Sequence, residues 1–342
     1  MNYYNPSTYL FMFMLFMGTM MTISANSWLA TWMGLEINLL SFIPLISNPM
    51  NMFSSEAALY YFIIQAIASS LFLFTIMTFS ILEKNSISMS NNLYNMISLM
   101  LFMKLGAAPF HFWLPKVMEG LNWMNCFILI TWQKIAPFSI LIFLMKHSIW
   151  FHLISISSIM VGAIGGINQT SLRKIMAYSS INHIGWMILA LQFNNSIWLI
   201  YFIIYSLMNF PLMSTFYYNQ TSHLNQFLLN NSSQELYYKF FISMSLFSLS
   251  GLPPFIGFLP KWLIIESLQM YSYSNLIILI LIISSILTLF YYLRIIMKIL
   301  LFFSTSNKWN IKMHINLLFI STSMFSLSIL GLPLMIFIFN FI

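Results

Sequence analysis

The sequence contains no aspartate, only six glutamates and a single cysteine among its 342 residues. Charged residues make up 6% of the chain, whereas a soluble domain carries about 25%. So few charges cannot cover a globule in water, which predicts an integral membrane protein. The lone Cys126 excludes a disulfide framework within the chain. The basic residues stand singly or in pairs despite a net charge of +7, so we expect no nucleic-acid partner.

Targeting signals are also scarce in the sequence. Residues 1–20 contain no lysine or arginine, so we expect neither the basic region of a signal peptide nor a transit peptide. The chain is hydrophobic and rich in isoleucine and asparagine, with 28 methionines and 34 phenylalanines. This composition favours a membrane protein that is encoded in an organelle.

Two similar apolar stretches, each interrupted by prolines, lie far apart in the chain. Residues 98–116 read SLMLFMKLGAAPFHFWLPK, and residues 243–261 read SMSLFSLSGLPPFIGFLPK. When the two stretches are aligned without a gap, the same residue type recurs at several positions. In the first stretch these are Ser98, Leu101, Phe102, Gly106, Pro109, Phe110, Leu114, Pro115 and Lys116. In the second they are Ser243, Leu246, Phe247, Gly251, Pro254, Phe255, Leu259, Pro260 and Lys261. Pro109 is predicted to break the first helix and Pro115 to break it again, and the backbone is expected to be non-helical around 106–110 and 251–257. Paired interrupted segments of this kind indicate an ion or substrate path.

Apolar runs of about 20 residues predict membrane-spanning helices. We expect an all-α, polytopic transmembrane bundle of about 11 helices, at 8–24, 28–46, 56–82, 93–118 (broken), 124–145, 150–168, 174–193, 196–218, 239–271 (broken), 274–300 and 313–341. The two broken spans are five apart in this order and therefore run in opposite directions, which indicates inverted repeats. Residues 28–145 form the first predicted half with an extra helix at 8–24, residues 150–300 form the inverted second half, and 313–341 form a C-terminal helix.

Basic residues in the predicted loops give the orientation of the chain. The loops on the N-terminal side hold Arg173, Lys174, Lys239, Lys298, Lys308 and Lys312, and the opposite loops hold Lys84 and Lys146. Positive residues are enriched on the inner side of membranes. The N-terminus is therefore expected on the positive-inside side and Ile342 on the other.

Four charged residues fall inside the apolar runs, namely Glu36, Lys104, Lys134 and Lys261. A charge near the bilayer centre costs about 2.5–3.5 kcal/mol, so these groups must pair or line a wet cavity. Snorkelling from a helix end is the alternative, and it applies best to Lys261. Burial disfavours the charged form of a lysine and a nearby carboxylate favours it. Movement of Glu36 toward or away from Lys104 would therefore load or unload a proton.

The sequence offers few other candidates for functional residues. His183 lies in the middle of a predicted helix and is a candidate proton relay between Lys134 and Lys261, because imidazole titrates near neutrality. A buried histidine bonded to a serine or tyrosine is the alternative. The six histidines are scattered without a metal-binding motif, so we expect no metal site. Gly162, Gly165 and Gly166 form no nucleotide loop and are expected to permit close helix packing.

Four runs together resemble a known family over essentially the whole chain. They are WMGLEINLLSFIPL at 32–45, KLGAAPFHFWLPKV at 104–117, TSLRKIMAYSSINHIGW at 170–186 and GLPPFIGFLPKW at 251–262. They resemble the antiporter-like subunits in the membrane arm of respiratory complex I, the mitochondrial NADH:ubiquinone oxidoreductase. The bacterial members have fourteen helices and the animal form lacks the first three, which agrees with the eleven spans.

The resemblance implies a proton-translocating subunit in the mitochondrial inner membrane. It implies that Glu36 is an ion-paired glutamate, Lys104 its partner, Lys134 a central connecting lysine and Lys261 the terminal lysine of the second half. Neighbouring antiporter-like subunits and other membrane-arm subunits would be its partners, with lipid or a subunit covering the flank at 8–24, 28–46 and 56–82. NADH, FMN, iron–sulfur clusters and ubiquinone would bind to other subunits, with no cofactor in this chain.

Two rival functions remain at the level of sequence. A free-standing cation/proton antiporter would share the broken helices, but the resemblance argues against it because the three helices that seal its flank are missing. A structural spacer without pumping would not need Glu36, Lys104, Lys134 and Lys261. Co-migration with a large NADH-oxidising assembly would exclude the free-standing antiporter.

Overall fold

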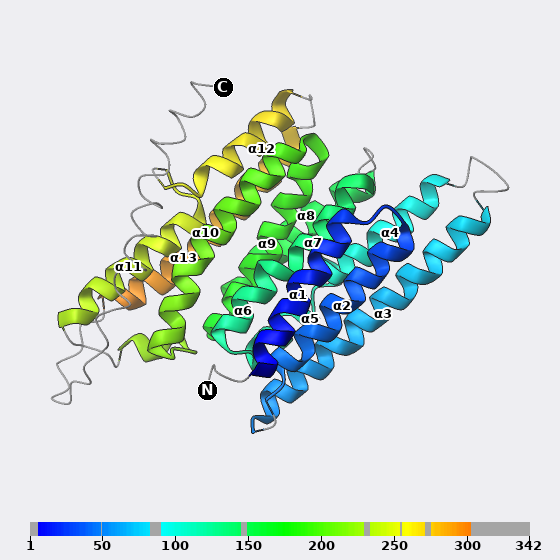
Figure 1. Ribbon diagram of the computed structural model, residues 1–342. Helices are drawn as coiled ribbons and strands as arrows, with labels where there is room; N and C mark the ends of the chain where they lie inside the picture. Colours follow the sequence, from blue (N-terminus) through cyan, green and yellow to red (C-terminus); the bar gives the residue numbers. More distant parts are fainter. Residues whose placement is uncertain are drawn as a thin grey trace. The chain divides into compact units, whose positions relative to one another are not determined.

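The chain forms a helical membrane protein of two compact units (Figure 1). The computed structural model describes residues 6–48, 50–82, 90–144, 149–228, 233–253, 255–270 and 275–301. Within these ranges the regular structure is helical, apart from an isolated β-bridge between Ser171 and His223. The units are Met1–Ser158 and Ile159–Ile342, and the division falls inside α8 (Ile149–Ile167). The predicted inverted relation between halves stays a prediction.

The first unit is built around α2 and α3. Its helices are α1 (Pro6–Ser24), α2 (Trp28–Ile46), α3 (Met52–Leu82), α4 (Ser90–Leu105), α5 (Trp113–Gly120), α6 (Trp123–Ile130) and α7 (Trp132–Leu144). Helix α2 packs against α1 and α3, and α3 also packs against α4 and α5. Helix α7 contacts α1, α2 and α4, so that α2, α3, α4 and α7 surround one interior.

The second unit is built around α9. Its remaining elements are α9 (Leu172–Phe193), α10 (Asn195–Asn219), the 3-10 helix η2 (Leu224–Leu228), α11 (Ser233–Ser250), α12 (Phe258–Met270) and α13 (Asn275–Leu301). Almost every side chain of α9 from Ile175 onward is buried, because α10 and α12 pack on it. The predicted close packing at Gly162 is confirmed, since a Cβ there would lie 2.5 Å from the Asn182 backbone nitrogen. The predicted helix at 313–341 lies outside the described residues.

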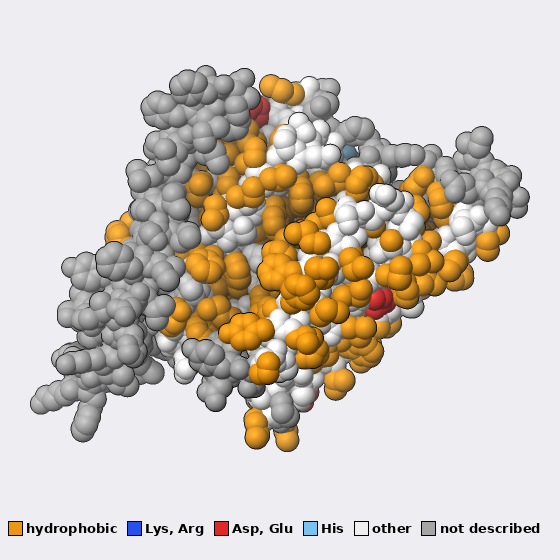
Figure 2. Space-filling model, viewed as in Figure 1, with side chains coloured by type: hydrophobic (Ala, Val, Ile, Leu, Met, Phe, Trp, Pro, Cys, Tyr) orange, Lys and Arg blue, Asp and Glu red, His pale blue; other side chains and the backbone are white. Residues whose placement is uncertain are grey.

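Several helices meet the requirements of a membrane span. In the described ranges, seven stretches are long and apolar enough to cross a bilayer: 6–24, 28–46, 52–81, 123–144, 150–167, 195–219 and 275–300. Large apolar side chains such as Phe13 and Leu59 lie exposed on α1 and α3. The face drawn in Figure 2 is mostly hydrophobic, with only isolated charged groups. Such a surface fits hydrocarbon and not water.

The two predicted helix breaks are present, but glycines make them. Helix α4 ends before Gly106 at φ +77°, and α11 ends before Gly251 at φ +78°. A residue in the left-handed conformation terminates a helix by capping its last carbonyls. The prediction that Pro115 breaks the first helix again was wrong, and the matching Pro260 does not break a helix either. Both lie in the first turns of α5 and α12, where an N–H group has no helical acceptor and proline is tolerated.

Two other sequence predictions need correction. The span predicted at 124–145 is present at 123–144, but it consists of two helices, α6 and α7, separated at Thr131 with φ −108° and ψ −70°. Pro137 lies inside α7. A proline inside a helix cannot donate to the carbonyl four residues earlier and its ring crowds that carbonyl, so a helix distorts upstream of its proline. Arg173, Lys174, Lys239 and Lys298 were assigned to loops, but the first two lie in the first turn of α9 and the others within α11 and α13. These helices continue past the ends of the apolar runs into polar residues.

Candidate functional site

The broken end of α4 is held by donors from three sources. The backbone N–H groups of Gly106 and Ala107 donate to Phe102 O at 3.0 and 3.1 Å. The Trp113 indole N–H donates to Met103 O at 3.1 Å, and the Gln65 amide Nε2 donates to Lys104 O at 3.2 Å. A helix end leaves its last carbonyls without helical partners, and buried carbonyls need replacements. The break is therefore a built feature that fixes where Lys104 stands.

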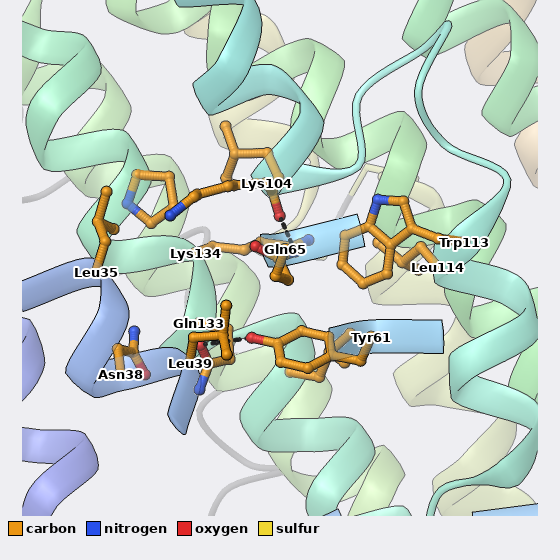
Figure 3. Close-up of a pocket in the computed structure, with 13 residues that line it drawn as sticks. Leu35, Asn38, Leu39, Tyr61, Gln65, Lys104, Trp113, Leu114, Gln133 and Lys134 are labelled. Carbon is orange, nitrogen blue, oxygen red and sulfur yellow. Dashed lines mark hydrogen bonds between the residues drawn. The ribbon is translucent and has the colours of Figure 1, made fainter. Parts of the chain in front are cut away.

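A buried polar pocket lies directly beside this break (Figure 3). The space inside it that water can occupy is about 20 Å³, enough for about one molecule. Helices α2 to α7 all contribute to its wall, which consists of Leu35, Asn38, Leu39, Tyr61, Gln65, Lys104, Leu105, Trp113, Leu114, Leu129, Gln133, Lys134 and Pro137. Two sequence-predicted lysines from different helices therefore share one cavity.

The polar groups of this pocket are well shielded from the surroundings. Lys104 and Lys134 are only 8% and 2% exposed. Tyr61 donates its hydroxyl hydrogen to Gln133 Oε1 at 3.3 Å, while Gln133 Nε2 and Asn38 Oδ1 have no hydrogen-bond partner among the described residues. Buried polar atoms of this kind are usually satisfied by ordered water. The pocket offers both donors and acceptors to such water.

Glu36 stands at the edge of this arrangement. It lies on α2 beside Leu35 and is half-buried, whereas Leu35 and Asn38 line the pocket. Its carboxylate interacts electrostatically with Lys104. Helices α2 and α4 both pack on α3 and α7, which brings these charges toward the same interior. An ion pair between them, direct or through one water, stays a prediction.

Lys261 occupies the corresponding break of the second unit. It is 6% exposed, and its Nζ donates to Ser250 O, the last carbonyl of α11, at 2.8 Å. The same Nζ lies 5.9 Å from the centroid of the Trp186 ring on α9. A cation suits a helix C-terminus because the unpaired carbonyls there carry partial negative charge. Lys261 is thus buried against a helix end rather than snorkelling to the surface.

His183 lies in the buried middle of α9, one turn before Trp186. Its Nδ1 is 2.8 Å from the Tyr201 hydroxyl of α10, and its ring centroid is 4.8 Å from that of Tyr205. The sequence alternative of a histidine bonded to a tyrosine is therefore present. A relay through this histidine is compatible with that bond and stays a prediction.

The two matching stretches have the same helix break but carry their charged residues at different positions. Lys104 aligns with Leu249, and Lys261 aligns with Lys116. Lys116 is exposed, with its Nζ 5.5 Å from the Tyr60 ring centroid, so it does not enter a core. Within the two matching stretches, the buried lysine therefore lies before the break in the first unit and after it in the second. Among the described residues, no three His, Cys, Asp or Glu side chains gather in a way that could hold a metal ion.

Sequence reasoning missed the amide side chains around the lysines. Asn38, Gln65 and Gln133 were not selected, although a buried amide in an apolar helix carries a desolvation cost. Gln65 lies four residues after Tyr61, which puts both on one face of α3. That spacing was the available signal. The partner of Gln65 could not be foreseen, because the Lys104 carbonyl is left open only by the helix break.

Comparison with known proteins gives a consistent family. The family model described as NADH:quinone oxidoreductase/Mrp antiporter, transmembrane, matches residues 25–290. The NADH-ubiquinone oxidoreductase chain 2 of Anopheles gambiae is 46% identical over 312 residues, covering 91% of each chain. The protein of the same name from Aedes aegypti is 46% identical over 331 residues, covering 95% of this chain and 96% of that one.

A solved structure shows the same fold. A chain in the structure of respiratory complex I from Thermus thermophilus with bound aureothin superposes with a TM-score of 0.81. The two sequences are 22% identical, and the match covers 96% of this chain and 80% of that chain.

Proposed function

The chain belongs to the NADH:quinone oxidoreductase/Mrp antiporter family, and within it to the chain 2 proteins of NADH-ubiquinone oxidoreductase, and from this premise we propose which of its residues carry protons. It is a proton-translocating membrane subunit of complex I and so takes part in an NADH:ubiquinone reductase reaction. The free-standing cation/proton antiporter is not favoured, because relatives at 40–46% identity over most of the chain are complex I subunits.

The proposed path in the first unit runs through Glu36, Lys104 and Lys134. The observation that carries it is the shared buried pocket of Lys104 and Lys134. A lysine in a low-dielectric site is poised between its charged and neutral forms, and a carboxylate nearby biases that balance. Displacement of Glu36 relative to Lys104 would then release a proton into the pocket, where Lys134 can accept it through water.

In the second unit, Lys261 is the proposed proton carrier and His183 a further relay. Two contacts support this: Lys261 reaches the open end of α11, and His183 is hydrogen-bonded to Tyr201. Imidazole can both give and take a proton near neutral pH. His183 lies on α9 three positions before Trp186, whose ring Lys261 approaches.

The redox chemistry is proposed to lie outside this chain. NADH, FMN, iron–sulfur clusters and ubiquinone would be bound by other subunits, and this chain would contribute proton translocation alone. Its partners are other membrane-arm subunits, which we propose include neighbouring antiporter-like subunits, with firmly bound lipid at its flank. The proposed location is the mitochondrial inner membrane, with the N-terminus on the matrix side.

Lys104→Met in the assembled complex tests the path. Methionine keeps the length and removes the exchangeable proton, so the complex should assemble and oxidise NADH while moving fewer protons per NADH into the lumen of proteoliposomes. Lys116→Met is the matched control, because Lys116 is exposed on α5, the helix that follows the same break. A Lys104→Met complex with the parental proton-to-NADH ratio would refute the path.

A further inference from the structure

Gln65 makes a bond that joins the backbone of the proton-carrying lysine to another helix. Its Nε2 on α3 donates to the carbonyl of Lys104 itself, at 3.2 Å. Only the NH₂ group of an amide can donate to a carbonyl, so this bond fixes which end of the side chain faces which way. The amide oxygen Oε1 is the group that remains for the pocket that Gln65 lines.

The position of Gln65 places this oxygen among the groups that would exchange a proton. Gln65 is buried, and Lys104 and Lys134 line the same pocket. Figure 3 shows Gln65 beneath the Lys104 carbonyl and beside Lys134. An amide oxygen accepts hydrogen bonds from an ammonium group or from water but does not itself take up a proton at neutral pH. Gln65 can therefore orient a proton donor without carrying the proton.

We propose that Gln65 is a positioning residue for proton transfer between Lys104 and Lys134, holding the broken end of α4 against α3 and presenting a fixed acceptor to the pocket. This inference rests on the function proposed above. The backbone bond sets where the Lys104 side chain begins, and the amide oxygen orients the donor that faces Lys134. Loss of the amide removes both constraints at once.

A neighbouring side chain separates this role from simple capping. Ser157 donates to Ala108 O in the same break at 3.3 Å, but it does not line the pocket. Ser157→Ala thus removes a hydrogen bond at the break and leaves the pocket wall unchanged.

The test uses Gln65→Met in the whole complex, reconstituted in proteoliposomes. Methionine has a similar length but neither donates nor accepts an amide hydrogen bond. We expect assembly and NADH oxidation to persist, the rate of proton translocation to fall about 2- to 10-fold, as one lost hydrogen bond implies, and the pH profile of translocation to move. Ser157→Ala should keep the parental profile.

Each outcome of this test decides between roles. Parental translocation and pH profile in Gln65→Met would overturn the inference, as would an equal defect in Ser157→Ala. Gln65→Asn, which keeps the amide but shortens its reach, replaces Gln65→Met if the latter does not assemble, and failure of both would assign Gln65 to folding alone. Normal pumping by Lys104→Met overturns the proposed function, whereas impaired Lys104→Met with normal Gln65→Met overturns only this inference.

Discussion

At the scale of single residues, Gly251 meets two demands that only glycine satisfies. Its φ is +78°, and a Cβ at this position would lie 3.0 Å from Lys261 Nζ and 3.0 Å from its Cδ. The left-handed conformation costs other residues about 1–2 kcal/mol, and the contact would displace the lysine as well. Gly251→Ala should therefore lower the amount of assembled subunit on native gels and reduce proton translocation in what assembles.

Ser250→Ala is the control for that substitution. Lys261 binds the backbone carbonyl of Ser250 and not its hydroxyl, which bonds to Phe247 O within the same helix. Alanine keeps the carbonyl in place, so translocation should stay within experimental error of the parent. Equal loss in Ser250→Ala and Gly251→Ala would mean that the turn as a whole, and not the fit of Lys261 above Gly251, matters.

At the level of residues, the sequence correctly predicted the burial of three lysines, because that prediction depends only on the free-energy cost of a charge inside an apolar run. Lys104, Lys134 and Lys261 are buried as expected from the charges inside apolar runs. The partners of these lysines could not be predicted, because they arise from the folded backbone. Ser250 O and Lys104 O become available only where a helix stops, and the sequence does not fix the residue at which it stops.

At the scale of helices, α1 and α2 cross with almost no space between their backbones. A Cβ on Gly34 would lie 2.6 Å from Thr22 Cγ2 and 2.9 Å from Thr22 N, and one on Gly18 would lie 2.9 Å from Asn38 N. Glycine permits such close packing between membrane helices. Helix α2 also carries Leu35 and Asn38, which line the pocket, so the close crossing of α1 and α2 determines the position of one pocket wall.

Gly34→Val should force these two helices apart. The new side chain meets backbone, which cannot rotate away, and such overpacking typically costs about 1–3 kcal/mol. We expect a lower temperature of inactivation of the complex, measured by proton translocation after heating. Met33→Ala is the control, because Met33 is 45% exposed and its loss should leave that temperature nearly unchanged. Equal thermal inactivation of both variants would contradict the tight crossing.

Helix positions were predictable to different degrees for physical reasons. Helix α2 has the predicted bounds, since a run of apolar residues between Ser27 and Ser47 marks both ends. The division between α6 and α7 was not foreseen, because Pro137 exerts its effect upstream, near the carbonyl of Gln133. The repeat in the sequence included the glycines of the two breaks. Their positive φ angles could not be predicted, because these depend on the folded backbone.

At the scale of the whole molecule, the described surface cannot exist in water. Large apolar side chains are exposed on α1 and α3, and lipid can cover them. Glu36 on the neighbouring α2 is only half-buried, and an unpaired carboxylate in hydrocarbon is costly. Another subunit, or firmly bound lipid, is therefore expected to cover the flank formed by α1, α2 and α3 in the assembly.

This requirement predicts that the chain is short-lived alone. A partner that binds only the folded form raises its population by mass action, and without that partner the unfolded form is exposed to degradation. The measurement is the lifetime of the tagged chain in membranes, followed after synthesis stops, with and without the other membrane-arm subunits. We expect a several-fold shorter lifetime in their absence. A monodisperse, long-lived monomer that conducts protons would instead show that the flank needs no cover, and it would restore the free-standing antiporter as the better description.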